Sequence, residues 1–195
     1  MKIKNKRIRK CLNRLGEALW NSKWVFPVLP EDNKIMFFAR DRADFPFLSN
    51  FYTCEIEIDG QLWPHTEAYY QSQKSENPRY HKRILEKEKP SWSKHIGDSR
   101  IGHPKLHKRS WFRKHPEDLR LDWNERKVDV MKIALQAKFT QNKELQQALL
   151  NTYPAELIED SKRDTFWGCG KDGSGNNMLG KLLMEQRASL MHDNF

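Results

Sequence analysis

The segment that most constrains this chain is residues 164–180, DTFWGCGKDGSGNNMLG, where a tryptophan and several glycines precede an amphipathic stretch. Because glycine lacks Cβ, Gly168, Gly173 and Gly175 can let backbone N–H groups come close to an anion. A helix starting at residue 176 or 177 would direct the positive end of its dipole to the same place. With Trp167 beside it, this loop suits a ligand that combines a phosphate, a sugar and a ring. The alternative is a glycine-rich connection between a strand and a terminal helix.

The length and composition of the chain limit the kinds of protein it can be. The 195 residues suffice for one domain with a real core, and 37% hydrophobic residues with 11% aromatic lie within the folded range. No apolar run reaches membrane-spanning length, and the start MKIKNKRIRK is charged where a secretory signal is apolar, so we expect a soluble, cytoplasmic protein without membrane contact. The three cysteines lack any CxxC spacing, which predicts reduced thiols rather than disulfides or a zinc site.

The positive charge is concentrated at one end. Of the net charge of +9, residues 1–34 contribute +6, from nine Lys and Arg against three Asp and Glu. We therefore expect a basic N-terminal extension at 1–34 and a domain at 35–195. The extension could contact DNA phosphates, with a salt-dependent affinity, or act as a solubilising tail. Both interpretations stay open.

Hydrophobic periodicity and turn residues predict most of the elements. We expect helices at 2–20, 67–76, 79–89, 117–139, 143–150 and from 176 or 177 to about 192, and strands at 35–39, 52–59, 61–63 and 156–159. Asp59-Gly60 is typical of a two-residue hairpin turn. Thr66 is the expected N-cap of the helix at 67–76. An apolar face on the helix at 117–139 is formed by Leu121, Val128, Met131, Leu135 and Phe139.

Four polar residues of the sequence EAYYQSQK share one helix face, because positions 67, 70, 71 and 74 are three, four and seven residues apart. On that face a carboxylate, Glu67, lies two turns from an amine, Lys74, an arrangement that can provide acid–base chemistry or an electrostatic clamp. The alternative is a solvated surface ion-pair network. Two adjacent tyrosines favour a face that packs or binds.

Two further motifs, and the histidines, bear on ligand and metal binding. In the sequence FLSNF at 47–51, a polar pair lies between apolar residues, so a rigid loop could present Asn50 to a base or ribose, or could be a simple turn. The string GNNMLGKL at 175–182 fails the phosphate-loop pattern, because Leu182 lacks the hydroxyl that binds magnesium. The seven histidines show no ligand spacing, so we expect neither a metal nor a cofactor.

Four separated motifs carry a family resemblance: FLSNFY at 47–52, WPHTEAYYQSQK at 63–74, VMKIALQAKFTQN at 130–142 and DTFWGCGKDGSGNNMLGKLLMEQR at 164–187. In order and spacing they resemble the NADAR, or YbiA-like, superfamily over roughly residues 35–190. The resemblance implies an α+β fold, a single helix-rich domain with a small β-sheet. It also implies an N-glycosidase that cuts the C1′–N bond between ribose and a base. Known activities of the family concern phosphoribosylated intermediates of riboflavin synthesis and ADP-ribosylated guanine in nucleic acid.

The resemblance also implies residue roles. Lys74 would attack C1′, Glu67 would act as acid and base, and Asp164 would stabilise the oxocarbenium-like charge that develops at C1′. Substrate binding would fall to Asn50, Phe51, Tyr70, Gln71, Trp167, Gly168, Gly173, Gly175 and Asn177. The backbone amides of residues 173–176 would hold phosphate. Cys169 stands where many relatives have aspartate, and we interpret it as a structural thiol.

Three function classes follow. A metabolite N-glycosidase and a nucleic-acid de-ADP-ribosylase share the chemistry, while a non-hydrolytic ADP-ribose-binding module would lack it. The presence of Glu67, Lys74 and Asp164 disfavours the binding module. The basic extension favours nucleic acid modestly over a free ribosylated base.

Overall fold

The computed structural model describes residues 29–38 and 45–192. In chain order the elements are β1 (Lys34–Phe37), the 3-10 turn η1 (Pro46–Leu48), β2 (Ile56–Ile58), β3 (Gln61–Trp63), α2 (Thr66–Ser72), α3 (Pro78–Leu85), α4 (Pro90–Ile96), the 3-10 turns η2 (Trp111–Arg113) and η3 (Pro116–Asp118), α5 (Trp123–Gln141), α6 (Lys143–Leu150), β4 (Glu156–Glu159) and α7 (Met178–His192). The helix predicted at 2–20 lies outside the described residues.

The strands form two small pairs rather than one sheet. β1 runs parallel to β4, and β2 and β3 form an antiparallel hairpin. At the hairpin turn, Asp59 and Gly60 both have positive φ, at 53° and 74°, as a type I′ turn requires, so the predicted turn is confirmed. The fold is mixed α+β and helix-rich, as expected. None of the described helices is long and apolar enough to cross a membrane.

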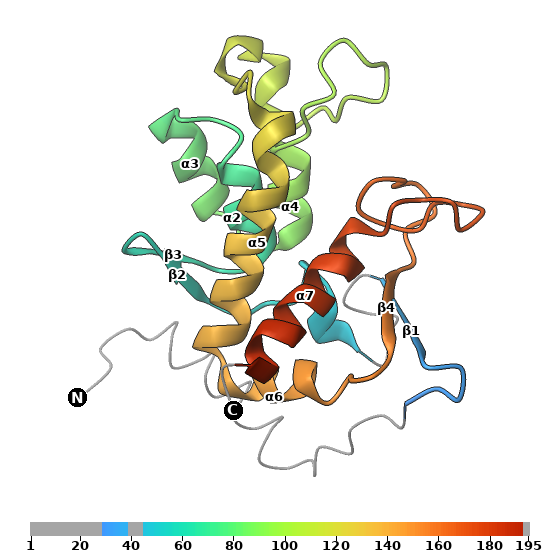
Figure 1. Cartoon of the computed structure of the whole chain (residues 1–195). Coiled ribbons are helices and arrows are strands. Elements are labelled where there is room, and N and C mark those ends of the chain that lie inside the picture. The colour runs from blue at the N-terminus through green and yellow to red at the C-terminus, as the bar shows by residue number, and fades with distance from the viewer. Residues whose placement is uncertain (1–28, 39–44, 193–195) are drawn as a thin grey trace.

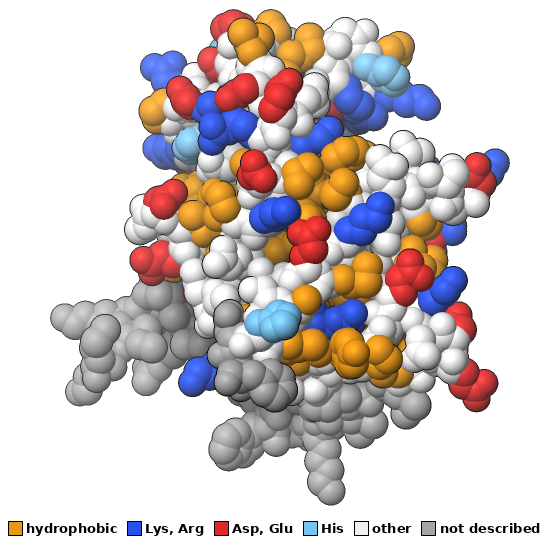
Figure 2. All heavy atoms as spheres, in the orientation of Figure 1, with side chains coloured by type: hydrophobic (Ala, Val, Ile, Leu, Met, Phe, Trp, Pro, Cys, Tyr) orange, Lys and Arg blue, Asp and Glu red, His pale blue; other side chains and the backbone are white. Residues whose placement is uncertain are grey.

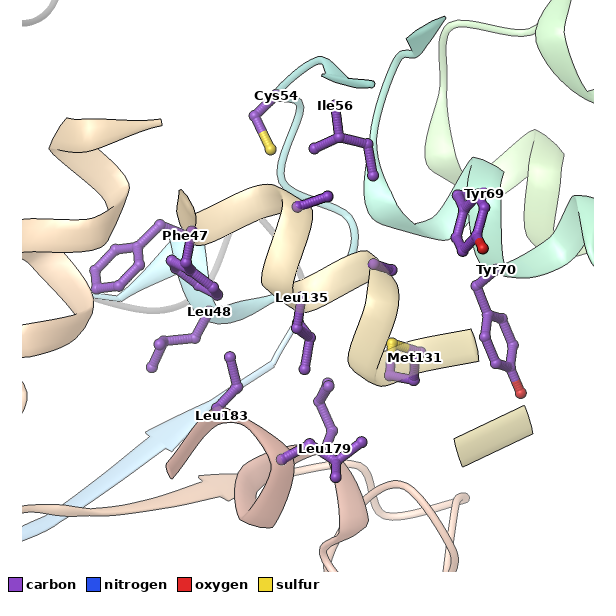
Figure 3. Close-up of a cluster of buried hydrophobic side chains, with 14 of the residues drawn as sticks. Phe47, Leu48, Cys54, Ile56, Tyr69, Tyr70, Met131, Leu135, Leu179 and Leu183 are labelled. Carbon is purple, nitrogen blue, oxygen red and sulfur yellow. The ribbon is translucent and has the colours of Figure 1, made fainter. Parts of the chain in front are cut away.

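The central helix α5 organises the fold. Figure 1 shows it running through the middle, with α2, α3 and α4 gathered towards its amino-terminal half and α7 crossing it on the side of the β1–β4 pair. In the core, Met131 and Leu135 of α5 point towards Leu179 and Leu183 of α7 (Figure 3). All four side chains are buried, so this contact removes a large apolar area from water.

The start of α5 was predicted too early. Residues 116–118 form a separate 3-10 turn, and Leu119 is extended, so the helix begins only at Trp123. Leu121, which the periodicity placed on the apolar face, is fully exposed. The difference arises at Leu119, whose extended ψ of 124° interrupts the helical backbone between the 3-10 turn and α5.

Helix α2 is short and buried along its whole length. All seven residues of Thr66–Ser72 are buried, and its neighbours are α3, α4 and α5. The N-cap is His65 rather than the predicted Thr66, because His65 Nδ1 accepts the Ala68 N–H at 2.9 Å. The helix ends at Ser72, four residues earlier than predicted, and α4 was not predicted. Lys74 therefore lies in the turn after α2.

The start of α7 is held close to β4. Asn177 Oδ1 accepts the Glu159 N–H at 2.9 Å, and Asn177 Nδ2 donates to the Leu157 carbonyl at 2.8 Å. This approach requires a glycine one turn later, because a Cβ on Gly180 would lie 2.0 Å from the Leu157 oxygen. The helix and strand can thus pack backbone to backbone, which fixes the loop between them.

We expect Gly180→Ala to lower the free energy of unfolding by about 3 kcal/mol, the upper range for overpacking a tight contact. The added methyl must displace strand β4 or break the Asn177 bonds, since the neighbouring atom is backbone. Urea denaturation would measure the loss. The exposed Ser189→Ala on the same helix is the control and should stay within about 0.5 kcal/mol. Equal stability of the two variants would contradict the packing argument.

Candidate active site

The predicted polar face of α2 is interior. Glu67, Tyr70, Gln71 and Lys74 are each no more than 7% exposed. The surface ion-pair network considered from the sequence is therefore excluded. Buried charged groups are costly unless they are paired or functional, so this face needs a chemical explanation.

Lys74 is held in a polar notch beside aromatic rings. Its Nζ donates to the Gly97 carbonyl at 2.7 Å and to Ser99 Oγ at 3.3 Å. The same atom lies 5.8 Å from the ring centre of Tyr70 and 5.5 Å from that of Trp123. Burial lowers the pKa of Lys74 from 10.5 to about 8, although the Glu67 charge opposes this. A lysine with that pKa supplies a neutral amine near physiological pH.

Glu67 faces the same interior. Its Oε1 accepts the side-chain N–H of Gln71 at 2.8 Å. Gln71 in turn fits only because residue 97 is glycine, since a Cβ there would lie 2.1 Å from Gln71 Oε1. Burial raises the pKa of Glu67, while Lys94, Gln71 and Lys74 act to lower it. The carboxyl can therefore hold a proton closer to neutral pH than an exposed glutamate.

An aromatic wall joins three segments at this point. The Tyr70 ring makes edge contacts with Trp123 of α5 and with Trp167 of the loop, at centroid distances of 5.0 and 5.6 Å. Figure 3 shows Tyr70 on the edge of the core, beside Tyr69 of the same helix. Trp167 is partly exposed. The structure thus brings the loop tryptophan to the α2 face, so two of the predicted motifs meet.

Asp164 shapes the loop that carries Trp167. Its Oδ1 accepts the N–H groups of Phe166 and Trp167, at 3.0 and 2.8 Å. This local turn, typical of aspartate, fixes the direction of the chain at the tryptophan. The Asp164 charge also acts on the Glu67 carboxyl and raises its pKa, so the two predicted catalytic carboxylates lie in one electrostatic environment.

Glu159, at the end of β4, is a third carboxyl group that the sequence did not indicate. Its Oε2 atom is enclosed and has no hydrogen-bond partner among the described residues. Burial, together with the charges of Asp164 and Glu67, raises the pKa of Glu159 to about 7, while the Lys94 charge opposes the rise. A strand pattern alone gives no reason to single out its last residue. No feature of the sequence therefore marked Glu159 as a site residue.

Two lysines at the edge of the site were also missed. Lys94 of α4 lies with Nζ 5.5 Å from the ring centre of Phe51, and Lys127 of α5 lies 3.9 Å from that of Phe166. Both positive charges act on Lys74 and help to lower its pKa. Lysines on charged helix surfaces are usually solvated, so nothing in the sequence distinguished these two.

The FLSNF loop is anchored from inside. Asn50 Nδ2 donates to Met131 Sδ at 3.3 Å, and its carbonyl accepts the Glu67 N–H at 3.3 Å. Below the loop, the fully buried Lys138 donates to the Ser49 carbonyl at 2.9 Å, and burial lowers the pKa of Lys138 to about 8. The structure thus places Asn50 and Phe51 beside α2, while their contact with a substrate stays a prediction.

The loop amides do not form the predicted phosphate site. Ser174 N–H donates to Asp172, Gly175 N–H to the Cys169 carbonyl and Asn176 N–H to the Thr165 carbonyl. The first amides of α7 are used as well: Met178 and Leu179 donate to the carbonyls of residues 166 and 167, both at 3.1 Å. The prediction that these amides and the helix end hold a phosphate is therefore wrong.

The glycines of the loop serve packing instead. A Cβ on Gly168 would lie 2.6 Å from Ser161 Cβ, and one on Gly175 would lie 2.4 Å from the Gly168 carbonyl oxygen. The side-chain oxygen and nitrogen of Asn177 are both hydrogen-bonded to the backbone of β4. Gly173 has a φ of 82° and open space around it, so a ligand contact there stays a prediction.

Cys169 is buried, with Sγ 3.7 Å from Asp160 Oδ1, and burial raises the pKa of its thiol. A raised pKa disfavours the reactive thiolate, in agreement with a structural role. Among residues 29–38 and 45–192, no group of three His, Cys, Asp or Glu could hold a metal ion. A hollow of about 720 Å³ is lined by residues 75–78 and 117–122 and contains none of the predicted site side chains.

The fold and the site define an α+β protein with a buried lysine surrounded by carboxyl groups and aromatic rings. The family model described as "NADAR domain" matches residues 36–191. The N-glycosidase YbiA of Escherichia coli (strain K12) is 36% identical over 160 residues, covering 82% of this chain and 90% of that protein. A riboflavin biosynthesis protein of Vibrio vulnificus is 35% identical over 155 residues, covering 80% of this chain and 38% of that protein. The NMR structure of Escherichia coli YbiA superimposes with a TM-score of 0.69 at 32% identity, covering 87% of this chain and 92% of that one.

The chain belongs to the NADAR domain family, whose similar curated members include N-glycosidases. The resemblance stated from the four motifs is thereby confirmed, as is the α+β fold. The family match begins at residue 36, while β1 begins at Lys34 and Leu29 packs against the core. The boundary at 34/35 and the role of the extension stay predictions.

Glu159→Gln should stabilise the protein more at pH 8 than at pH 5. A carboxyl whose pKa in the folded state is raised to about 7 lowers the free energy of unfolding as the pH rises from 4.5 through 7, because the same carboxyl ionises first in the unfolded chain. Glutamine removes that penalty, so the difference between variant and native chain should grow by at most about 3 kcal/mol across this window. Urea denaturation at both pH values measures it.

The matched control is Glu156→Gln, an exposed carboxylate on the same strand, which should stay within about 0.5 kcal/mol at both pH values. A destabilisation by Glu159→Gln that is equal at both pH values would mean that the carboxylate is a structural partner and not an unpaired group.

Proposed function

We propose that this chain is an N-glycosidase that hydrolyses the C1′–N bond between a ribose and a base. The observation that supports this best is the buried Lys74 amine, which shares one interior face with the Glu67 carboxyl. A module that only binds ADP-ribose has no need for an amine of lowered pKa beside proton-holding carboxyls. The names of the relatives, N-glycosidase YbiA and riboflavin biosynthesis proteins, support the same reaction class.

In the first step, the neutral amine of Lys74 attacks C1′. Its two N–H groups donate to Gly97 and Ser99, so the nitrogen lone pair remains for the new bond. As the Nζ–C1′ bond forms, the C1′–N bond to the base breaks and its electron pair leaves with the base. Glu67 donates a proton to the departing base, since its raised pKa favours the protonated form.

In the second step, water releases the sugar. After the first step Nζ is a cationic secondary amine, and ring opening transfers one of its protons to the ribose ring oxygen and leaves a protonated Schiff base. Glu67, now ionised, takes a proton from the water that adds to C1′. The hydroxyl proton of this adduct then moves to Nζ as the C1′–Nζ bond breaks, which gives the sugar aldehyde, the neutral Lys74 amine and protonated Glu67. Asp164 and Glu159 lie in the same electrostatic environment and would stabilise positive charge at C1′ when ionised.

The aromatic wall provides a binding surface for the base of the substrate. Trp167 is partly exposed and held in place by Tyr70 and by the Asp164 turn, so its ring is a fixed surface on which a planar base can stack. Phe51 and Asn50 lie beside α2 and are candidates for contacts with the base or the ribose. Two substrate classes fit this proposal: phosphoribosylated riboflavin intermediates, and ADP-ribosylated guanine in DNA.

Lys74→Met tests the covalent step. We expect turnover to fall at least about a hundredfold, because the nucleophile is lost. Sodium cyanoborohydride added during turnover should trap a ribosyl adduct on Lys74 in the native chain, and mass spectrometry would locate it. The trapping rate should increase as the pH rises towards about 8, where the amine becomes neutral. Parallel arms would use a ribosylamino-pyrimidine phosphate and a guanine-ADP-ribosylated oligonucleotide.

The control is Lys138→Met, which removes another buried lysine whose pKa is also lowered to about 8 but which contacts the Ser49 carbonyl. That variant should keep the adduct on Lys74. Turnover of either substrate without any adduct, and undiminished turnover by Lys74→Met, would each rule out covalent catalysis by this lysine.

A further inference from the structure

Two segments that carry residues of the candidate active site or their contacts also line a basic cavity. A cavity of about 640 Å³ is lined by Arg100, His103, Lys105 and Arg163. Its two walls come from the segment after α4 and from the loop after β4, which lie opposite each other at the upper right of Figure 1. Over the first of these segments, Figure 2 shows blue and pale-blue side chains gathered together. Every residue that lines this cavity is basic.

The donors of this cavity are partly fixed. Arg100 is held by a two-pronged pair with Asp98, in which Nε and Nη2 donate to the two carboxylate oxygens at 2.8 and 2.6 Å. This pair leaves other guanidinium N–H groups for a ligand. His103 Nδ1 accepts the Lys105 N–H at 3.0 Å, so the other ring nitrogen carries the proton and is a donor. With Asp98 counted against Arg100, Lys105 and Arg163, the cavity keeps a net charge of +2.

Both walls connect directly to the candidate active site. Arg163 precedes Asp164, and Arg100 follows Ser99, whose hydroxyl contacts the Lys74 amine. The cavity is therefore lined by the direct chain neighbours of two residues that belong to the candidate active site or contact it. The cavity volume is sufficient for a phosphate together with the atoms attached to it.

We propose that this cavity binds a phosphate group that is attached to the sugar of the substrate. The proposal rests on the N-glycosidase function and assigns its phosphate contacts to these four side chains. The amides of residues 174–176 are already bonded within their loop, so a substrate phosphate needs charged side chains instead. Arginine and lysine provide such contacts through charge-assisted hydrogen bonds.

The double variant Lys105→Ala/Arg163→Ala tests this cavity in the full chain. The probes are ribose 5-phosphate, followed by calorimetric titration, and a fluorescein-labelled twelve-nucleotide oligothymidylate, followed by anisotropy. We expect Kd to rise about tenfold for at least one probe, and the salt dependence of that binding to decrease by one to two phosphate contacts. The control Lys82→Ala/Lys143→Ala removes the same charge from exposed helix positions and should change Kd less than twofold.

The two arms distinguish the source of the phosphate. A loss for ribose 5-phosphate alone assigns the cavity to the phosphate of a small substrate, whereas a loss for the oligonucleotide assigns it to a nucleic-acid backbone. Unchanged binding of both probes, or an equal loss in the control, overturns the proposal. The double variant Lys105→Ala/Arg163→Lys should recover part of the affinity, because lysine restores the positive charge at residue 163. Neither probe depends on turnover, so absence of hydrolysis by the native chain would reject the N-glycosidase and leave this result standing.

Discussion

The burial of α2 is the constraint on which the rest of the structure depends. A seven-residue helix is marginal by itself, yet this one is covered by α3, α4 and α5 and carries Glu67 on its interior face, with Lys74 in the turn that follows. Desolvation opposes both charged forms. The cost is offset by apolar burial in the rest of the core, including the contact of α5 with α7. The stability that permits charged groups to be buried at the site therefore comes from the rest of the core.

Local periodicity was sufficient to predict that α2 exists, because residues at spacings of three and four share a helix face, although the helix ends before Lys74 at spacing seven. It was also sufficient for α6, β3 and β4, whose bounds match the structure. The pattern could not say that the face is interior, since that depends on α4, which follows a charged segment without clear periodicity. Leu121 shows the opposite failure: it fits the periodicity of α5 but lies before the helix begins.

The site residues missed from the sequence are those whose role arises only in three dimensions. Glu159 ends a strand, and Lys94 and Lys127 lie on charged helices, so each has an ordinary local context. Lys94 and Lys127 matter through their electrostatic effect on Glu67 or Lys74, and Glu159 matters because Asp164 and Glu67 act on its own pKa. All three lie on segments distant in sequence from α2. The phosphate prediction failed for a related reason. Glycine content indicates that amides can approach an anion, but not that carbonyls of residues 165–169 already accept them.

The internal hydrogen bonds that exclude these amides from phosphate binding also explain the structural role of the loop. The hydrogen bonds within the loop, including those accepted by Asp164 Oδ1, fix its backbone so that it can hold Trp167 against Tyr70. Rigidity of this kind removes the loop from phosphate binding, so the positive charge must come from flexible side chains around it. Unpaired atoms such as Glu159 Oε2 and Gln71 Oε1 then remain as the costs of a preorganised interior. Both atoms are enclosed, so the folded chain itself bears this cost and the apolar core must offset it.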